Sequence, residues 1–424
     1  MLGITREGGE RQGGSMSSVK KSGRFTFSLF MSVVLFALPL GGCSIGGEDS
    51  DAFDAYGILL SSSPGDQVFD ASVVHQIEVT LAPENWQAII DAAAAYVNDN
   101  REYPYYRARV AFDGEELNGD VGCRLKGHIS IDLAVGHAFP LKLDFNRYVP
   151  GQAMDGLKKL NLNTNFAGPT APMLRDFLSY EAWRQFGVAA SRTAFTKLTV
   201  NGEDLGIYVM VEQVDGDFIE RHFSGPYGDL YKPEQISGSL AYSGSDISGY
   251  PDIGHKWPDE TDHASLLNAL EVLHSGSRED IEGVFDVEGV LTYMAGNVAL
   301  GSWDYYPNTG HNYYLYEITP GRFTMLPWDM NGSQEYAGLS LCNPTQGYLS
   351  GKLLEDPANL DFYRDILTDF LSDTGSIQWL TSRLDVARSV LDPDLFGDVD
   401  DIRNAIIERV NSLQEELATA GDCP

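Results

Sequence analysis

Two short segments late in the chain carry the residue types best suited to phosphate chemistry. Asp304 follows one tryptophan, and Asp329 follows another tryptophan 25 positions later. Between them, residues 312–316 and 322–326 have the composition of two strands joined by a Thr-Pro-Gly turn. Such a hairpin can bring both aspartates and Asn312 to one end of a sheet. Two carboxylates and an amide gathered there suit a hard divalent cation that carries nucleotide phosphates, whereas the simpler alternative is that each aspartate only ends a strand in a turn.

A cationic stretch inside an acidic chain is a second candidate feature. The 424 residues carry a formal charge of −32, yet residues 121–200 contain ten Lys and Arg against five Asp and Glu. If the fold gathers those cations, they can hold an anion; otherwise they are scattered surface charges that pair with nearby acids. The acidity of the whole chain repels phosphate backbones, so the sequence predicts no nucleic-acid partner.

The N-terminus has the pattern of an export signal. A basic cluster at 20–24 precedes an apolar run at 25–40, and Leu-Gly-Gly-Cys ending at Cys43 resembles a bacterial lipobox. A transmembrane anchor is the alternative, but sixteen apolar-biased residues are short for one. We therefore expect residues 1–42 to be a signal peptide, Cys43 to be lipidated and 43–72 to form a flexible tether. The expected location is an exported, membrane-anchored lipoprotein, periplasmic or at the cell surface.

Three cysteines remain after Cys43. In an exported protein they permit one disulfide and one spare thiol. We expect Cys342 to pair with Cys423, and Cys123 to be buried in a strand. No Cys and His spacing indicates zinc.

Residues 73–424 have the composition of a globular domain, with 43% hydrophobic residues in the whole chain. The pattern predicts an α+β domain with an antiparallel, sheet-rich N-terminal part, a helix-rich C-terminal part and a cleft between them. The Gly-, Ser- and Asp-rich stretch that follows Lys232, to about Pro258, is expected to be a long excursion or lid. The predicted strands are 75–81, 106–112, 119–125, 139–145, 159–163, 193–200 and 205–212, and the predicted helices are 83–97, 173–186, 263–275, 286–300, 359–373, 375–390 and 399–419.

Several motifs occur in an order that matches a known family. They are Arg124-Leu125-Lys126-Gly127, Phe139-Pro140-Leu141-Lys142, Lys159-Leu160-Asn161-Leu162, Leu174-Arg175-Asp176-Phe177, Val200-Asn201-Gly202, Trp303-Asp304, His311-Asn312-Tyr313-Tyr314 and Pro327-Trp328-Asp329. Over about residues 73–415 the chain resembles the spore-coat protein H (CotH) kinase family. The resemblance implies an atypical protein-kinase-like fold. It also implies phosphorylation of Ser or Thr in partner proteins with ATP and a divalent metal, Mg²⁺ or Mn²⁺.

The resemblance assigns roles to the two aspartates. Asp304 matches the family's catalytic residue and would accept the proton of the acceptor hydroxyl. Asp329 matches the metal-binding residue, and Asn312 is a second metal ligand or a residue that orders the loop. Asn331 stands where family members often carry a second aspartate, which lowers the negative charge of the expected metal site.

The phosphates need cationic ligands, for which we nominate Lys142, with Arg124 and Lys126 as alternatives. Glu212, at the end of a predicted strand, could pair with one of these lysines as in a kinase. Each could equally be a surface or acid-paired strand residue.

Three functions compete at this point. The first is a metal-dependent kinase that acts on exported or surface proteins. The second is a surface assembly or adhesion protein that keeps the kinase-like fold without catalysis. The third is an extracellular hydrolase with Asp304 and Glu212 as its carboxylate pair. The expected partners are a protein substrate or surface partner and, through the lipid on Cys43, a membrane.

Overall fold

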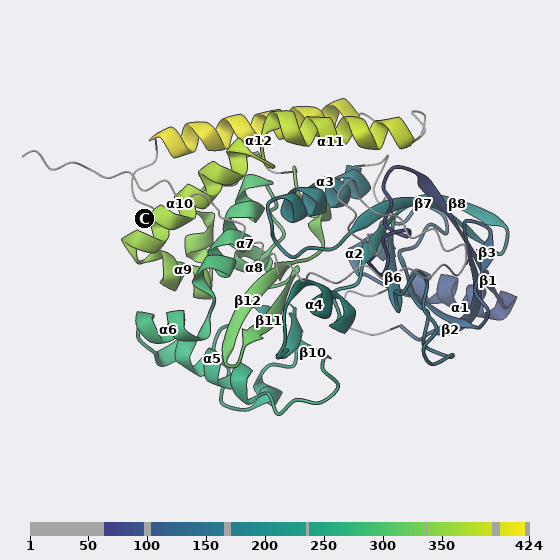
Figure 1. The fold of residues 1–424 in the computed structure, drawn as a ribbon, viewed down its shortest axis with the longest axis horizontal. Helices are drawn as coiled ribbons and strands as arrows, with labels where there is room; N and C mark the ends of the chain where they lie inside the picture. The colour runs from purple at the N-terminus through teal and green to yellow at the C-terminus, as the bar shows by residue number, and fades with distance from the viewer. Residues whose placement is uncertain are drawn as a thin grey trace, which may run out of the picture. The chain divides into compact units, whose positions relative to one another are not determined.

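An eight-stranded sheet forms the N-terminal part of the protein and curls until its ends meet (Figure 1). The computed structural model describes residues 63–96, 103–164, 171–234, 237–335, 337–391 and 399–419. The strands follow the order β1-β7-β8-β6-β5-β4-β2-β3, and an extra pairing of β1 with β2 closes the sheet into a barrel. They are β1 (Val74–Leu81), β2 (Tyr106–Phe112), β3 (Glu115–Glu116), β4 (Val121–Leu125), β5 (Leu141–Asp144), β6 (Lys159–Asn163), β7 (Thr193–Val200) and β8 (Glu203–Glu212).

One pairing differs from the predicted antiparallel sheet. β1 runs parallel to β7, with Val74 opposite Phe195, while its other neighbour, β2, is antiparallel. The barrel encloses its own apolar core, because alternate β1 residues, including Ile77 and Val79, point inward. Helix α1 (Pro83–Ala94) contributes Trp86 to the same core. The sheet-rich N-terminal part is therefore confirmed, but as a closed barrel with one parallel contact.

A smaller sheet of four strands lies in the C-terminal part, in the order β10-β9-β11-β12. The predicted hairpin is confirmed as β11 (Tyr313–Thr319) and β12 (Arg322–Pro327). β9 (Leu230–Pro233) ends where the stretch expected to be an excursion or lid begins, and β10 (Ile253–Trp257) lies within that stretch; the sequence predicted neither strand.

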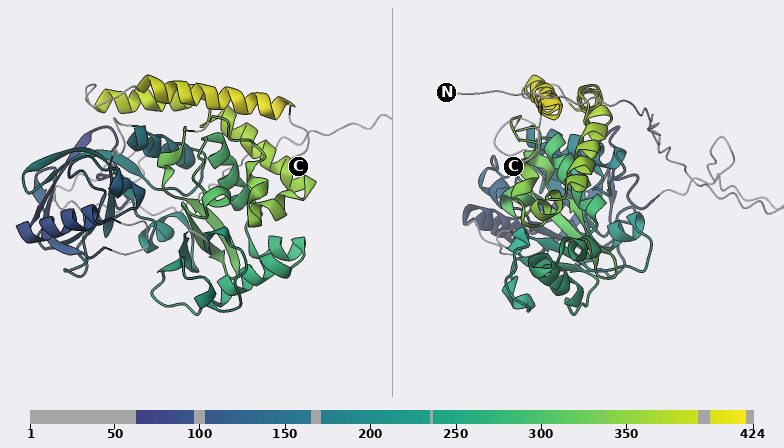
Figure 2. Two further views of the ribbon diagram at one scale, coloured as in Figure 1. Left: turned by 180° about the vertical axis from the view of Figure 1, so that it is seen from behind. Right: turned by 90° about the vertical axis from the view of Figure 1, so that its left-hand side faces the viewer.

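Helices surround this second sheet, as the sequence predicts for the C-terminal part (Figure 1). Helices α11 and α12 pack side by side (Figure 2). The described helices that follow the barrel are α4 (Gly216–His222), α5 (Ala264–Ser275), α6 (Arg278–Val284), α7 (Val287–Ala299), α8 (Tyr306–Thr309), α9 (Tyr348–Leu354), α10 (Pro357–Ser372), α11 (Ile377–Val390) and α12 (Val399–Thr419). Short α2 (Ile129–Asp132) lies between barrel strands.

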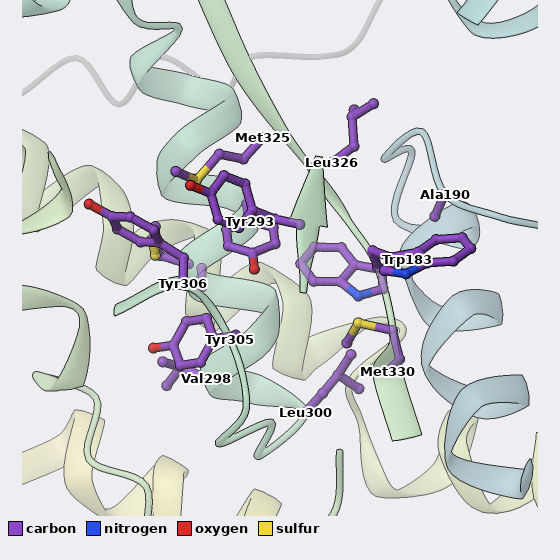
Figure 3. Packing of buried hydrophobic residues seen from close by; sticks show 14 of the residues in the cluster. Trp183, Ala190, Tyr293, Val298, Leu300, Tyr305, Tyr306, Met325, Leu326 and Met330 are labelled. Atoms are coloured by element: carbon purple, nitrogen blue, oxygen red, sulfur yellow. The ribbon is translucent and has the colours of Figure 1, made fainter. Parts of the chain in front are cut away.

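Helix α3 (Ala171–Gln185) joins the two parts, since it comes between barrel strands in the chain but packs into the C-terminal core. Its Trp183 lies near Tyr293 of α7, with ring centroids 6.4 Å apart and planes 10° from parallel (Figure 3). A Cβ on Gly296 would lie 2.0 Å from the Trp183 ring, so only glycine allows this approach of α7 to α3. α3 is thus fixed against the helices that lead to Asp304.

Two sequence predictions concern cysteines and membranes. Cys342 is disulfide-bonded, and Cys123 is a buried free thiol as predicted. The predicted partner Cys423, the signal peptide, Cys43 and most of the tether lie outside the described residues. Within the part of the chain that the structure describes, no helix combines the length and apolar character needed to span a bilayer.

Candidate active site

Asp304 lies in the loop that follows α7, and Asn312 holds this loop in place. The Asn312 side-chain amide donates to the main-chain oxygen of Asp304 at 2.9 Å. Tyr293 of α7 in turn donates its hydroxyl to the main-chain oxygen of Asn312 at 3.2 Å. Asn312 has φ +63°, a left-handed conformation that asparagine tolerates better than most residues. Of the two roles expected for Asn312, ordering the loop is the one that a hydrogen bond supports.

His311 binds the carboxylate of Asp304. Its Nε2 lies 2.7 Å from Asp304 Oδ1. Burial lowers the pKa of His311, but the hydrogen bond and the charge of Asp304, together with Asp329 and Glu234, outweigh it and raise the pKa above its ordinary value. The His311 imidazole therefore binds a proton more readily than a free one, and its Nε2 orients the Asp304 carboxylate.

Asp329 occupies a strained turn two residues after β12. Its φ is +54°, in the left-handed region that costs a non-glycine residue energy. The turn is held because the Asp329 N–H donates to the Tyr180 hydroxyl of α3 at 2.9 Å. The side chain of Asn331 also donates to Asp329 Oδ1 at 2.5 Å. The backbone of the turn is therefore held from α3, and the carboxylate is held by Asn331 from within the turn.

The two aspartates lie near each other. A Cβ on Gly332, in the turn that follows Asp329, would lie only 3.4 Å from Asp304 Cβ. The pKa of Asp329 is raised, first by burial and then by the negative charge of Asp304, while Lys126, Lys232 and His311 oppose the rise. A buried carboxylate whose pKa is raised by a neighbouring carboxylate would be relieved by a bound cation.

Lys126 brings a positive charge from the barrel to this site. It follows β4, and its ammonium lies 5.9 Å above the centroid of the Trp328 ring, next to Asp329 in sequence. Its Nζ donates to Asn163 Oδ1. Burial lowers its pKa to about 8, although Asp329 and Asp176 act in the opposite direction. Lys126 is thus the link between the barrel cations and the aspartates.

Asp176 of α3 belongs to the same cluster, and sequence reasoning did not select it as a site residue. It is buried and accepts a hydrogen bond from Asn163 Nδ2 at 3.0 Å. Among the described residues, its Oδ1 has no hydrogen-bond partner. Burial and then the charge of Asp329 raise its pKa to about 7. The signal in the sequence was an aspartate beside Leu174, Phe177 and Leu178, which are all buried.

Lys142 and Arg124 face each other across β4 and β5. The Lys142 Nζ donates to Gln213 Oε1 at 2.5 Å, and Arg124 lies over the Tyr105 ring at 5.1 Å. Burial, followed by the charges of Arg124, Lys159 and Lys126, holds the pKa of Lys142 well below its ordinary value. Crowded, buried cations of this kind would gain from a bound anion.

Glu212 does not pair with a lysine as the sequence suggested. Glu212 is 2% exposed, and its carboxylate binds Arg192 and Arg221. Burial raises the pKa of Glu212, but hydrogen bonds from both guanidinium groups outweigh it and lower the pKa. A carboxylate held in this way is a poor general acid, which argues against the hydrolase interpretation.

The donor set for a metal is small. In the described ranges, no three or more His, Cys, Asp or Glu side chains are arranged to hold a metal ion. Two aspartates and the asparagines next to them offer hard oxygen ligands, which fit Mg²⁺ or Mn²⁺ when phosphate oxygens and water complete the shell.

Comparison with known proteins gives the family. The model of the family described as CotH kinase protein matches residues 124–417, which is more than half of the chain. The chain belongs to this family.

Individual relatives are distant. Inner spore coat protein H of Bacillus subtilis (strain 168) is 21% identical over 256 residues, covering 54% of this chain and 66%, just under two thirds, of that protein. Among solved structures, the Helicobacter pylori proinflammatory kinase CtkA aligns with a TM-score of 0.31 and 10% identity, over 67% of this chain and 93% of that one.

Proposed function

We propose that this protein is an atypical protein kinase that transfers the γ-phosphate of ATP to Ser or Thr of exported or surface proteins and needs a divalent metal. The observation that carries this proposal is the approach of Asp304 to Asp329, with the barrel's Lys126 close to both Trp328 and Asp329. Membership of the CotH kinase protein family supports it. The barrel would supply cations for the phosphates, and the C-terminal part would supply the carboxylates.

We assign Asp304 the role of the base that accepts the proton of the acceptor hydroxyl. The hydroxyl oxygen bonds to the γ-phosphorus while the bond from this phosphorus to the β–γ bridging oxygen breaks, and ADP leaves with that electron pair. Because His311 binds Oδ1 of Asp304, Oδ2 is the oxygen we assign to the departing proton. His311 therefore orients the carboxylate without being the base itself.

We assign Asp329 the role of metal ligand, with Asn312 or Asn331 as an additional oxygen ligand. A divalent cation bound there would neutralise charge on the transferred phosphoryl group. Lys142, Arg124 and Lys126 are assigned the phosphates. Burial and neighbouring cations disfavour the charges of the two lysines until an anion is bound.

Transfer of radiolabelled γ-phosphate tests the function. The purified full chain, incubated with labelled ATP and Mg²⁺ or Mn²⁺, should label itself or an added protein on Ser or Thr. Asp304→Asn should lower the rate by about 10²- to 10⁴-fold. If the native chain transfers no label with Mg²⁺ and none with Mn²⁺, the result favours the alternative hypothesis of a non-catalytic surface protein.

We also propose that the lipid on Cys43 anchors the protein at a membrane outside the cytoplasm. The sequence before it supports this through a basic cluster, an apolar run and Leu-Gly-Gly-Cys. In cells that export it, the native chain should partition into detergent and Cys43→Ala into the aqueous phase. Equal partitioning of the two would reject the anchor.

A further inference from the structure

A lysine of the second sheet faces the candidate active site, and the proposed function gives it no role. Lys232 lies on β9, and the pairing of its neighbour Tyr231 with Leu315 places it beside Tyr314 of β11. Residues opposite each other on paired strands point to the same side of a sheet. The Tyr314 hydroxyl accepts a hydrogen bond from Gln213 Nε2, at the end of the barrel strand β8, at 3.0 Å. Lys232 therefore lies on the sheet face that is turned toward the barrel.

Glu234 holds the ammonium group of Lys232. The Lys232 Nζ lies 2.5 Å from Glu234 Oε1. The main chain of Glu234 is itself fixed, since its N–H donates to the Asp252 oxygen and its oxygen accepts from the Gly238 N–H, at 3.0 Å each. Across the border with the barrel, Glu234 Oε2 lies 4.0 Å from Nε2 of His128, which belongs to the connection between β4 and β5. The Lys232–Glu234 pair is thus placed where the barrel and the C-terminal part meet.

The charges of this pair act on both assigned aspartates. Burial, then Asp304, raises the pKa of Asp329, and Lys232 is one of the cations that oppose the rise. Burial lowers the pKa of His311, which binds Asp304, and Glu234 is one of the anions that raise it. Solvent screens such effects over longer distances, so they add to the evidence that the pair borders the site of both carboxylates.

Lys232 remains charged and open to a ligand. Burial lowers its pKa, but the charge of Glu234, followed by Tyr314, outweighs burial and raises the pKa above its ordinary value. The Lys232 side chain is 26% exposed. Opposite Lys232 on β10 stands Gly254, which has no side chain to cover it. An ammonium group carries three donors, so it can bind Glu234 and an anion at the same time.

The cations already assigned to the phosphates all come from the barrel. Arg124 and Lys142 lie on β4 and β5, and Lys126 follows β4. Lys232 instead belongs to the sheet whose last strand leads to Asp329. During transfer the γ-phosphoryl group leaves ADP and approaches the acceptor. Cations on the barrel can stay with ADP, whereas a cation of the C-terminal part can stay with the group that moves.

We propose that Lys232 is a further catalytic residue, whose ammonium group binds the non-bridging oxygens of the γ-phosphoryl group during its transfer, and that Glu234 is the positioning residue that holds this ammonium. Lys232 keeps its protons and forms no covalent bond, so its contribution is to stabilise charge in the transition state. This inference rests on the proposed kinase function, because it adds two residues to the same site.

Rates of phosphate transfer by variants of the full chain test this role. Lys232→Met should lower kcat by about 10²- to 10³-fold and leave the KM for ATP within about threefold of the native value. Lys232→Arg keeps the charge and should recover part of kcat. Glu234→Gln should lower kcat less than Lys232→Met does, because the cation remains but is no longer held. The double variant Lys232→Met/Glu234→Gln should be no slower than Lys232→Met, since Glu234 acts through Lys232.

A transition-state mimic provides a readout that needs no catalysis. ADP and Mg²⁺ with aluminium fluoride imitate the phosphoryl group in transfer, and they should raise the melting temperature of the native chain more than ADP and Mg²⁺ alone. Lys232→Met should keep the rise with ADP and lose the additional rise. The double variant repeats this measurement without leaving Glu234 charged and unpaired in the fold. Lys197→Met, which breaks only an exposed pair with Asp204, is the control and should behave as the native chain.

Three results would contradict these assignments. Native kcat in Lys232→Met, or a raised KM for ATP with unchanged kcat, would overturn the catalytic role of Lys232. A double variant that is much slower than Lys232→Met would overturn the positioning role of Glu234. If the native chain transfers no phosphate and no nucleotide changes its melting temperature, the kinase proposal itself fails and the role of Lys232 falls with it.

Discussion

At the scale of single residues, Asp304 and Asp329 differ in what surrounds them. Asp304 is partly exposed and tied to His311, whereas Asp329 sits in a turn held by Tyr180 and close to Lys126. An exposed carboxylate can meet an acceptor hydroxyl, and one fixed among cations suits the metal and phosphates. The substitutions Asp304→Asn and Asp329→Asn should therefore have different effects.

Nucleotide binding should distinguish the role of Asp304 from that of Asp329. ATP with Mn²⁺ should raise the melting temperature of the native chain, because a ligand that binds only the folded state stabilises it. Asp304→Asn should keep this rise although transfer is lost, and Asp329→Asn should abolish it. Differential scanning fluorimetry measures both. Asp385→Asn on α11, which only loses an exposed pair with Arg403, is the control and should behave as the native chain.

Glu212 should prove structural. Glu212→Gln leaves Arg192 and Arg221 without their buried anion, and a broken buried pair costs about 3–5 kcal/mol. Urea unfolding should show this loss of stability, whereas the KM for ATP should change little under conditions where the variant is folded. A large rise in that KM with unchanged stability would instead restore Glu212 to the nucleotide site.

Much of the site followed from the sequence, because strand ends are visible in it. Asp304, Asn312 and Asp329 were selected because they flank a short predicted hairpin, whose open end brings its first and last residues together. β11 and β12 form this hairpin, with Tyr313 opposite Pro327. Asp176 was missed because its role depends on where α3 packs, which local pattern does not reveal. The one indication in the sequence was an acidic residue among the apolar residues of a predicted helix.

At the scale of elements, α12 braces the loops of both aspartates through one buried side chain. Arg409 is 2% exposed and donates to the main-chain oxygen of Val298, near the end of α7. It also donates to the oxygens of Ala337 and Leu339, which follow the Asp329 turn, at 2.7 Å each. The last long helix thus connects two segments that are distant in sequence.

Arg409→Met should test this brace. It removes the donors and leaves buried carbonyl groups unpaired, so we expect a loss of about 3–5 kcal/mol in the free energy of unfolding. Transfer should slow at temperatures where the variant stays folded, since both loops lose their support. Chemical denaturation and single-turnover rates measure the two effects. Arg403→Met, which breaks only an exposed pair of the same helix, should cost less than about 1 kcal/mol.

Prediction of elements succeeded where the signal was local and failed where it was not. The hairpin of β7 and β8 follows from Asn201-Gly202, which supplies the positive φ angles of a tight turn. β9 and β10 were missed because both are short and β9 pairs with β11, about eighty residues later, so that little of the signal is local. The parallel pairing of β1 with β7 was missed because it too joins segments that are distant in the chain.

At the scale of the whole molecule, buried charge should make stability depend on pH. Burial and Asp329 raise the pKa of Asp176 to about 7 from the ordinary value of 3.8. Between these values the folded chain keeps a proton that the unfolded chain releases, so the free energy of unfolding should decrease as pH rises from about 4 to about 7.

Comparison of the native chain with Asp176→Asn isolates this contribution. The difference in unfolding free energy, measured by urea denaturation, should shift in favour of the variant across pH 4 to 7 and level off above it. Contributions of carboxylates that do not interact with Asp176 cancel in the difference. A difference that does not vary across this interval would mean that Asp176 is ionised throughout, as an ordinary aspartate is.

The closed barrel also imposes an order on folding. β1 contacts both β2 and β7, yet more than a hundred residues separate it from β7 in the chain. While the polypeptide emerges from a ribosome, its first strand lacks one neighbour until Thr193–Val200 has appeared. Closing such a long loop is slow and leaves an open strand edge meanwhile. Chaperones that shield nascent strands should therefore matter more for this barrel than for the helices that follow it.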